Sequence, residues 1–332
     1  MVVWRYPDGH WPNVMALLYI LAMYVCGWLL LFIDSIGLNI VGSVVLAHSM
    51  VIAAYMIHEC AHNTIFLRPQ LNARLGNALM WVTGACYGKY EDIRHKHFRH
   101  HMDKADVVSF DYRPRLAQYP LLVKIMKALE WAYIPAVEIM MHLLVIILPF
   151  IKENRRQHRK HVLTVLAVRS SVFLLLAWFK PIVILFYVIA YFLFMTVMRF
   201  MDVHQHTYEV FETLDQPRGK EAEQFDSDYE YRNTFSNIIS LQHPALNLLV
   251  LNFGYHNAHH VKPTTPWYRL PALHTSLYGD NREQILPFIN LLKSYHRYRV
   301  PRMLNADEAD QNTLEKGLAF IGVDGVSFLT AH

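Results

Sequence analysis

Histidines gathered in three short clusters are the residues of this sequence that are best placed to do chemistry. The first cluster, HECAH, has two histidines four residues apart, and the later clusters HFRHH and HNAHH each have three histidines at positions i, i+3 and i+4. On a helix, both spacings place the imidazoles on one face, about one turn apart. The eight histidines are His58, His62, His97, His100, His101, His256, His259 and His260.

This arrangement of histidines predicts a site for metal ions. Protonated imidazoles so close together would repel one another, so the clusters make physical sense if the rings are neutral and share a cation. Neutral imidazole binds iron, copper, nickel and zinc, and the spacing does not select among them. Eight nitrogen ligands are too many for one tetrahedral or octahedral ion, and a structural zinc site closes with four. The pattern therefore indicates two ions that keep positions open for a small molecule.

A ninth histidine and two carboxylates are further candidates. In the segment MDVHQH, Asp202 and His206 are four residues apart and would share a helix face if the preceding helix continues. We expect His206 to be a ninth ligand, and Asp202 either to bind through water or to hold a ligand in place. His204 would face away from that pair. Glu59 either orients an imidazole or lies on the helix surface, and it forms with Asp202 the pair of candidate catalytic carboxylates.

Two other functions compete for these histidines. The first cluster also satisfies the HExxH pattern, in which Glu59 would be the general base of a membrane zinc metalloprotease. No third zinc ligand follows at a suitable place, and the other two clusters would stay unexplained, so this is a distant alternative. A metal transporter would need ionisable residues distributed through its membrane spans, whereas the clustered histidines lie beyond the expected span ends.

Four stretches with few or no charges are long enough to cross a membrane, which takes about 20 helical residues. They form two hairpins, with turns at Asp34 and at Lys180 and Pro181, and the expected spans are residues 14–33, 35–57, 162–179 and 182–201. The predicted fold class is an all-α membrane protein with four transmembrane helices, interfacial helices and a cytosolic histidine-rich cap. Residues 58–161 and 202–332 form this cap.

The positions of lysine and arginine predict which side each segment faces. Of 31 such residues, 16 lie between the second and third spans and 12 lie at or after Arg199. Under the positive-inside rule both polar segments, and therefore every histidine cluster, face the cytoplasm. The apolar residues 131–151 could form a fifth span, but this would move the basic loop 152–161 outside. Pro135 and Pro149 favour a broken helix in the membrane interface instead.

The composition agrees with a membrane protein. Apolar residues make up 54% and charged residues 17% of the 332 residues, whereas a soluble domain has about 25% charged residues. The net charge of +4 is not gathered on one amphipathic helix, so we expect no nucleic-acid partner. The tail from Arg302 onward runs from acidic to apolar and is expected to form a docking helix.

The three clusters, taken together, resemble the histidine boxes of the membrane fatty acid desaturase superfamily. HECAH, HFRHH and HNAHH match these boxes in order, spacing and position relative to the expected spans. The flank FGYHNAHHVKPTTPWYRLP is similar to that of the last box, and HQHTYE lies where relatives have an extra histidine. The resemblance runs from about Ile52 to Leu273, and it makes residues 1–332 a single fatty acid desaturase-like domain.

The resemblance implies a diiron oxidoreductase. Two iron ions would be held by the eight box histidines and His206, would activate dioxygen, and would remove hydrogen from an unactivated methylene of an acyl chain. The expected partners are a fatty acid or acyl lipid as substrate, a separate electron-donor protein of ferredoxin or cytochrome type, and the membrane. The expected location is a bacterial inner membrane, with the metal site facing the cytoplasm.

The reaction of such a site is open from sequence. The superfamily includes desaturases, hydroxylases, carotenoid ketolases and a bacterial branch that forms terminal alkenes by oxidative decarboxylation, and the spelling of the boxes does not separate them. Desaturation is the expected reaction. The segment RHKHFRHHMDKADVVSFDY and the compact length resemble the branch with the decarboxylases, so terminal-alkene formation is the main alternative, beside acyl or carotenoid hydroxylation.

Basic residues crowd around the second box. They form either a solvated face or a docking patch for an acidic electron donor or an acidic headgroup. These residues are Lys89, Arg94, Lys96, Arg99, Lys104, Arg113 and Arg115.

Overall fold

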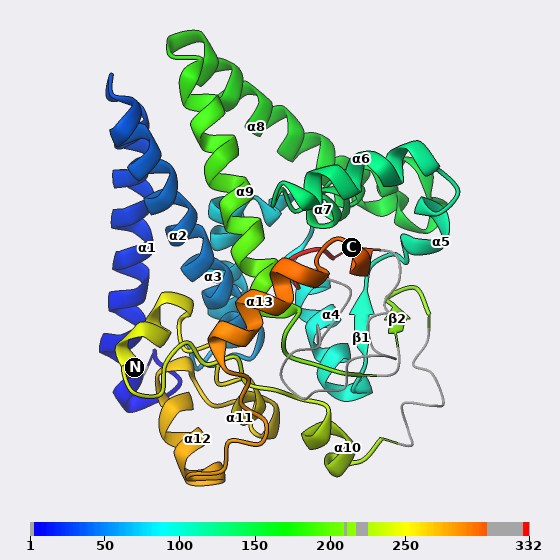
Figure 1. Cartoon of the computed structure of the whole chain (residues 1–332). Coiled ribbons are helices and arrows are strands. Elements are labelled where there is room, and N and C mark those ends of the chain that lie inside the picture. The colour runs from blue at the N-terminus through cyan, green and yellow to red at the C-terminus, as the bar shows by residue number, and fades with distance from the viewer. Residues whose placement is uncertain (1–2, 209–210, 217–224, 304–327, 332) are drawn as a thin grey trace. The chain divides into compact units, whose positions relative to one another are not determined.

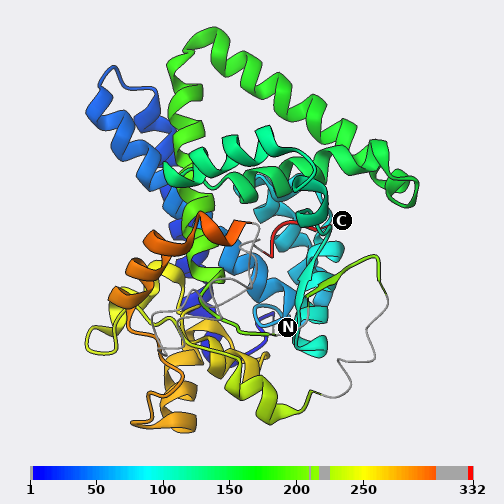
Figure 2. The ribbon, with the colours of Figure 1, turned by 45° about the vertical axis from the view of Figure 1, so that its right-hand side comes forward.

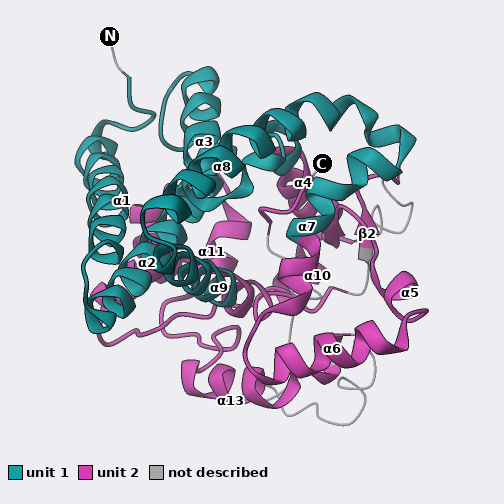
Figure 3. Ribbon diagram, turned by 90° about the horizontal axis from the view of Figure 1, so that it is seen from above, with its two compact units in different colours: residues 1–93, 142–197, 332 teal, residues 94–141, 198–331 magenta. Residues whose placement is uncertain are grey.

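The computed structural model describes residues 3–208, 211–216, 225–303 and 328–331 (Figure 1). Two compact units are distinguished in Figure 3. Of the described residues, unit 1 contains 3–93 and 142–197, and unit 2 contains 94–141, 198–208, 211–216, 225–303 and 328–331. Of the expected docking helix in the tail, residues 304–327 lie outside the described part of the chain.

Unit 1 begins with a helical hairpin of α1 (His10–Leu31) and α2 (Ile36–Ala61), seen side by side in Figures 1 and 2. The side-chain amide of Asn39 donates to the carbonyls of Leu30, Leu31 and Ile33 at 2.9, 3.1 and 3.0 Å. It thereby contacts carbonyl groups at the end of α1, where the helix leaves carbonyls without intrahelical partners. Gly27 lets the two helices approach closely, because a Cβ there would lie 2.9 Å from the Cβ of Leu46. The helix α3 (Pro69–Thr83) packs on α2.

The second hairpin consists of α8 (Arg159–Phe179) and α9 (Ile182–Asp202), with Lys180 and Pro181 between them as predicted. Lys180 Nζ donates to the carbonyl of Phe32 at 2.7 Å and pairs with Asp34 in the first hairpin's turn. Arg169, the single charge inside the third predicted span, donates from Nη2 to the Tyr187 hydroxyl at 3.0 Å. A polar partner on the facing helix is what an ionisable residue within a span requires.

Four helices of the described chain are long and apolar enough to cross a membrane, as predicted. They are Pro7–Leu31, Ile36–Ala61, Glu153–Phe179 and Ile182–Asp202. The alternative fifth span is broken, because α6 (Pro120–Trp131) ends before α7 (Ala136–Ile151) begins and Tyr133 between them has a φ of 61°. At about 1.5 Å per residue, α7 reaches about 24 Å, which is short of the roughly 30 Å of a hydrocarbon core.

Unit 2 is built from short helices and one small sheet. Strands β1 (Asp106–Val108) and β2 (Phe211–Thr213) are parallel, with Asp106 opposite Phe211. The helices α4 (Tyr90–Asp103), α7 and α9 each contribute residues to both units. The remaining helices are α5 (Arg113–Leu116), α10 (Ser227–Arg232), α11 (His256–Val261), α12 (Leu270–Tyr278) and α13 (Phe288–Tyr298). Short 3₁₀ segments occur at Pro7–Gly9, Ala85–Tyr87, Glu153–His158, Pro244–Val250, Trp267–Arg269 and Pro301–Met303.

A buried ion pair joins two elements of unit 2. Arg199, 2% exposed, contacts the Glu130 carboxylate, which is itself 1% exposed and accepts the backbone N–H of Val137 at 3.1 Å. Arg299 donates from Nε to the Glu130 carbonyl at 2.9 Å, and its guanidinium lies 3.8 Å from the centre of the Tyr133 ring. The turn between α6 and α7 is thus held by two arginines that come from distant parts of the sequence.

The substitution Glu130→Gln tests this ion pair. It keeps the shape of the side chain but leaves the buried guanidinium of Arg199 without an opposite charge. We expect a loss of about 3–5 kcal/mol in the free energy of unfolding, measured by SDS-induced unfolding in detergent micelles.

The matched control is Glu153→Gln, which removes an exposed ion pair with Arg156. Exposed pairs contribute about 0–1 kcal/mol, so this variant should unfold almost like the unchanged protein. Equal losses in the two variants would contradict a structural role for the buried pair.

Candidate metal centre

The second histidine box lies on α4, and the sequence of this segment favours a helix. Glu91 and Asp92 occupy its first turn, while His100 and His101 lie in its last turn, and both placements complement the helix dipole. The i, i+3, i+4 spacing brings His97, His100 and His101 to one face. The neighbouring His95 is exposed, in agreement with its position outside the ligand pattern.

Four histidines of unit 2 form a first group. The ligand atoms of His100, His206, His256 and His260 all lie within 4.8 Å of one another. His206 Nε2 is 3.0 Å from His100 Nε2 and 2.8 Å from His256 Nε2. Ligands at right angles on an ion with metal–nitrogen bonds of about 2.1 Å would be about 3.0 Å apart. A nitrogen of neutral imidazole carries at most one hydrogen, so His206 Nε2 cannot donate to both neighbours.

The outer nitrogens of His100, His206 and His260 have partners that turn the Nε2 atoms of these rings toward the centre of the group. His100 Nδ1 lies 2.9 Å from the Ala105 carbonyl and must donate to it, since a carbonyl only accepts. His260 Nδ1 is 3.0 Å from Glu230 Oε1, and His206 Nδ1 is 3.4 Å from the Thr234 hydroxyl. His260 Nε2 is buried and has no hydrogen-bond partner among the described residues. Hydrogen bonds to the outer nitrogen are typical of histidines that bind a metal through the other nitrogen.

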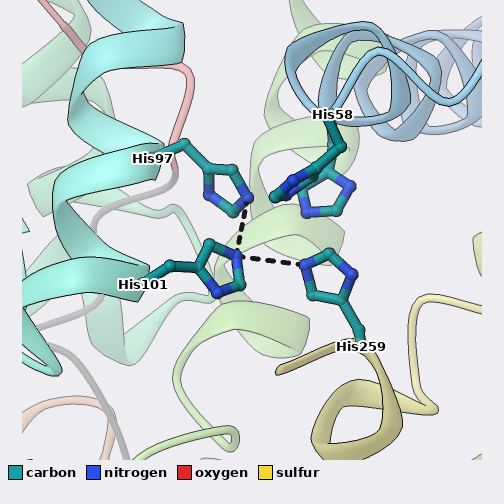
Figure 4. A group of neighbouring side chains, drawn as sticks. His58, His97, His101 and His259 are labelled. Carbon is teal, nitrogen blue, oxygen red and sulfur yellow. Dashed lines mark hydrogen bonds between the residues drawn. The ribbon is translucent and has the colours of Figure 1, made fainter. Parts of the chain in front are cut away.

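A second group consists of His97, His101 and His259, whose side chains point toward one another in Figure 4. His101 Nε2 is 3.1 Å from both His97 Nε2 and His259 Nε2. Because His101 Nε2 can donate to only one of them, a shared cation would explain this convergence too. Unit 2 therefore brings together all seven predicted ligands that it contains, in two groups that fit metal ions.

The first box lies in unit 1, at the end of α2. His58 is in the last turn of α2 and His62 is its C-terminal capping residue, and the centres of their rings are 4.8 Å apart. Between them, Glu59 is 3% exposed, so the expectation that it lies on the helix surface is wrong. Glu59 Oε1 is 3.5 Å from His58 Nδ1, and Glu59 Oε2 accepts from the Thr64 hydroxyl at 2.6 Å. These contacts fit a carboxylate that orients an imidazole.

The structure corrects the route by which His206 was expected to reach the site. Helix α9 ends at Asp202, so Asp202 and His206 do not share a helix face. Instead His206 forms a β-bridge with Thr234. The backbone N–H of Phe235 donates to Gln205 at 2.7 Å, which holds the segment in place. His204 Nδ1 lies 2.8 Å from the Phe200 carbonyl and does not join either histidine group.

Asp202 lies on a cavity in unit 2 that four of the histidines also line. The cavity has a volume of about 60 Å³, and its lining residues are Lys96, His97, His100, Val107, Asp202, Gln205, His206, Phe253, His256 and Phe328. Since a cavity needs about 10–15 Å³ measured in this way to hold one water molecule, this space holds a few waters or a small part of a larger molecule. Asp202 is 9% exposed, and its Oδ2 atom has no hydrogen-bond partner among the described residues.

Burial keeps three of the imidazoles neutral. It lowers the pKa of His100 to about 4, and it lowers the pKa of His206 and His260 well below the usual range, with neighbouring imidazoles adding to the effect for these two. Burial also lowers the pKa of Lys96 to about 8, although Glu138 and Asp202 oppose the shift. These three histidines are thus in the neutral form that binds metals near neutral pH.

Neither alternative for the basic residues around the second box, a solvated face or a docking patch, fits Arg99 and Lys96. Arg99 and Lys96 are 6% and 4% exposed. Arg99 Nε donates to Asp103 Oδ2 at 2.6 Å and the guanidinium also pairs with Glu212, while Lys104 pairs with Glu230 at 3.8 Å. Several of these charges therefore serve the interior of unit 2. The i,i+4 spacing of Arg99 and Asp103 was a sequence signal for such a pair.

Glu230 and Phe328 are site residues that the sequence did not indicate. Glu230 holds His260 from α10, thirty residues before it in the chain, and no ligand pattern surrounds it. Phe328 lines the cavity from a segment far beyond the third box. In both cases the contact depends on how distant segments come together in the fold. The local spacing of residues carries no information about such contacts.

Comparison with known proteins identifies the class. The family model of the fatty acid desaturases matches residues 35–291, which include all three boxes and His206. The chain belongs to this family. It is therefore an oxidoreductase and a multi-pass membrane protein that acts on fatty acid lipids, in a family that generally uses two irons and dioxygen. Among curated proteins the comparison finds no match.

The substitution Glu230→Gln tests whether the carboxylate supports a metal ligand. It replaces the acceptor of His260 Nδ1 with an amide and should weaken metal binding by about 10–100-fold. The measurement is iron content per chain after dialysis against graded chelator concentrations.

The matched control is Asp228→Asn on the same helix, where the carboxylate forms an exposed ion pair with Arg232. This variant should retain iron like the unchanged protein. Identical chelator curves for all three proteins would show that Glu230 has no role in binding.

Proposed function

We propose that this protein is an oxygen-dependent diiron desaturase that acts on the acyl chain of a fatty acid or lipid. The observation that carries the proposal is the convergence of seven imidazoles in two groups of unit 2, with neighbouring Nε2 atoms 2.8–3.1 Å apart. Family membership supports the choice of iron. The proposal adds His58 and His62 as ligands of the same two ions, on the basis of the three-box pattern.

In this proposal the residues of the chain have distinct tasks. The nine histidines bind two iron ions, which supply dioxygen activation and the oxidation of an unactivated C–H bond. The Ala105 carbonyl, Glu230 and Thr234 fix the orientation of three of these rings. Asp202 binds a water molecule in the cavity through its unpartnered Oδ2 atom. Val107 and Phe253 are apolar parts of the cavity wall and limit the access of other water molecules.

Electron balance requires a separate donor. Formation of a carbon–carbon double bond releases two electrons and two protons from the substrate, while reduction of dioxygen to two water molecules consumes four of each. The other two electrons must come from outside, because the substrate supplies only two. We propose a ferredoxin- or cytochrome-type protein as their source, in keeping with the protein's supply of binding and orientation around a metal that does the oxidation.

The product identifies the reaction. Membranes that contain the protein are incubated with an electron donor, oxygen and a panel of acyl substrates, and lipids and headspace are analysed by gas chromatography with mass spectrometry. We expect an internal alkene, and His256→Ala should reduce its formation by at least about 100-fold.

The matched control is His95→Ala, which removes an exposed histidine from the same seven-residue stretch as the second box and should leave the product yield unchanged. An alcohol or a volatile terminal alkene would replace desaturation by hydroxylation or decarboxylation. A protein that needs zinc, loses its activity in Glu59→Gln and tolerates His256→Ala would support the metalloprotease instead.

We propose that the protein lies in a bacterial inner membrane with its metal site facing the cytoplasm. The distribution of basic residues supports the cytoplasmic side, and a labelling experiment tests this orientation. With Cys26 replaced by serine, a cysteine is introduced at the exposed Asn154 or at Asp34 in the turn of the first hairpin. In intact cells, an impermeant maleimide should react with the cysteine at 34 only. Reaction at 154 from outside would reverse the proposed topology.

A further inference from the structure

A short segment at the end of the described chain lies inside unit 2. Residues 328–331 are separated from the third histidine box by more than sixty positions. Leu329 is 2% exposed, and Thr330 and Ala331 are 0% exposed. Phe328 is partly exposed, and the complete burial of the three residues after it, near a metal-binding cavity, calls for a physical reason.

Two side chains of unit 2 hold this segment by its backbone. Lys96 Nζ donates to the carbonyl of Thr330 at 3.0 Å and lies 3.3 Å from its hydroxyl, while the Ser109 hydroxyl donates to the same carbonyl at 2.7 Å. A buried ammonium group is costly unless hydrogen bonds and opposite charges compensate it. Lys96 lies next to His97 on α4, so its bonds tie the segment to the helix of the second box.

Phe328 is the residue of this segment that lines the cavity. Its side chain lines the same space of about 60 Å³ as His97, His100, His206 and His256. The centres of the Phe328 and His97 rings are 6.0 Å apart. An apolar cavity that holds a benzene molecule measures roughly 150 Å³. The present space is thus too small for a ring, and removal of the Phe328 ring would enlarge it.

We propose that residues 328–331 form a wall of the reaction cavity, anchored by Lys96 and Ser109, and that Phe328 determines which acyl chains fit beside the metal ligands. This inference rests on the proposed function, because it concerns the substrate of the same site. Phe328 is a specificity-determining residue in this view, and Lys96 and Ser109 are positioning residues. Straight acyl chains are accepted, whereas chains with a methyl branch at the reacting carbons meet the phenyl ring.

The seating of the segment is tested without activity. Hydrogen–deuterium exchange of the full-length protein, followed by mass spectrometry, reports the amides of residues 328–331. In the double variant Lys96→Met, Ser109→Ala these amides should exchange at least about tenfold faster than in the unchanged protein. The charge-matched control Lys124→Met changes an exposed lysine of α6 and should show no effect. Fast exchange in the unchanged protein, or equal rates in all variants, would overturn the anchored wall.

The role of Phe328 is tested by the ratio of products. Unchanged protein, Phe328→Ala and the control Phe288→Ala are supplied with a mixture of straight-chain and methyl-branched saturated fatty acids. Phe328→Ala should raise the ratio of branched to straight product by about tenfold or more. One methyl group typically changes the discrimination of a hydrophobic pocket between two substrates by this factor. Phe288→Ala should leave the ratio unchanged, and iron content should be the same in all three.

The outcomes separate the two proposals. An unchanged product ratio in Phe328→Ala with full iron content would overturn the specificity role while leaving the desaturase function in place. If the unchanged protein converts none of the acids, the proposed function fails and the specificity role with it. The exchange experiment would still decide whether Lys96 and Ser109 anchor the segment.

Discussion

The arrangement of unit 2 depends on a constraint on hydrogen: neutral imidazoles cannot satisfy one another when several nitrogens meet. His100 must keep its hydrogen on Nδ1 to bond the Ala105 carbonyl, and its Nε2 atom then presents a lone pair to His206 Nε2 at 3.0 Å. His206 has His256 on its other side at 2.8 Å. Burial prevents protonation from relieving the conflict. A cation that accepts all of the lone pairs resolves it.

The rest of unit 2 is organised to keep these rings in place. Glu230 reaches His260 from α10, the bridge to Thr234 fixes His206, and the helical spacing of α4 aligns His97, His100 and His101. Charged side chains near the site are buried inside unit 2 and pair with one another there. Arg99 forms ion pairs with Asp103 on α4 and with Glu212 on β2. The pair with Glu212 joins α4 to β2. Precision at the histidines is thus supplied by several separate parts of the chain.

The sequence predicted the membrane helices well, because hydropathy and the absence of charge are properties of each segment alone. The turns at Asp34 and at Lys180 and Pro181 lie where they were expected, and α9 ends one residue beyond its predicted limit. The box histidines were also found from local spacing. His206 was selected on a helical argument that fails, since α9 ends at Asp202 and a β-bridge places the residue. Glu230 and Phe328 could not be found, because nothing adjacent in sequence marks a partner that folding supplies from elsewhere.

The segment from Lys96 to His101 has little freedom to change its length. Within six positions it supplies a lysine that anchors residues 328–331, three imidazoles in two groups and an arginine in a buried charge cluster. Each extra residue in a helix turns everything after it by about 100° and advances it by about 1.5 Å. A single insertion between Lys96 and His100 would therefore swing two of the rings away from their groups at once. Insertions are better borne in the exposed turns at the membrane hairpins, where the chain reverses without meeting the metal ligands.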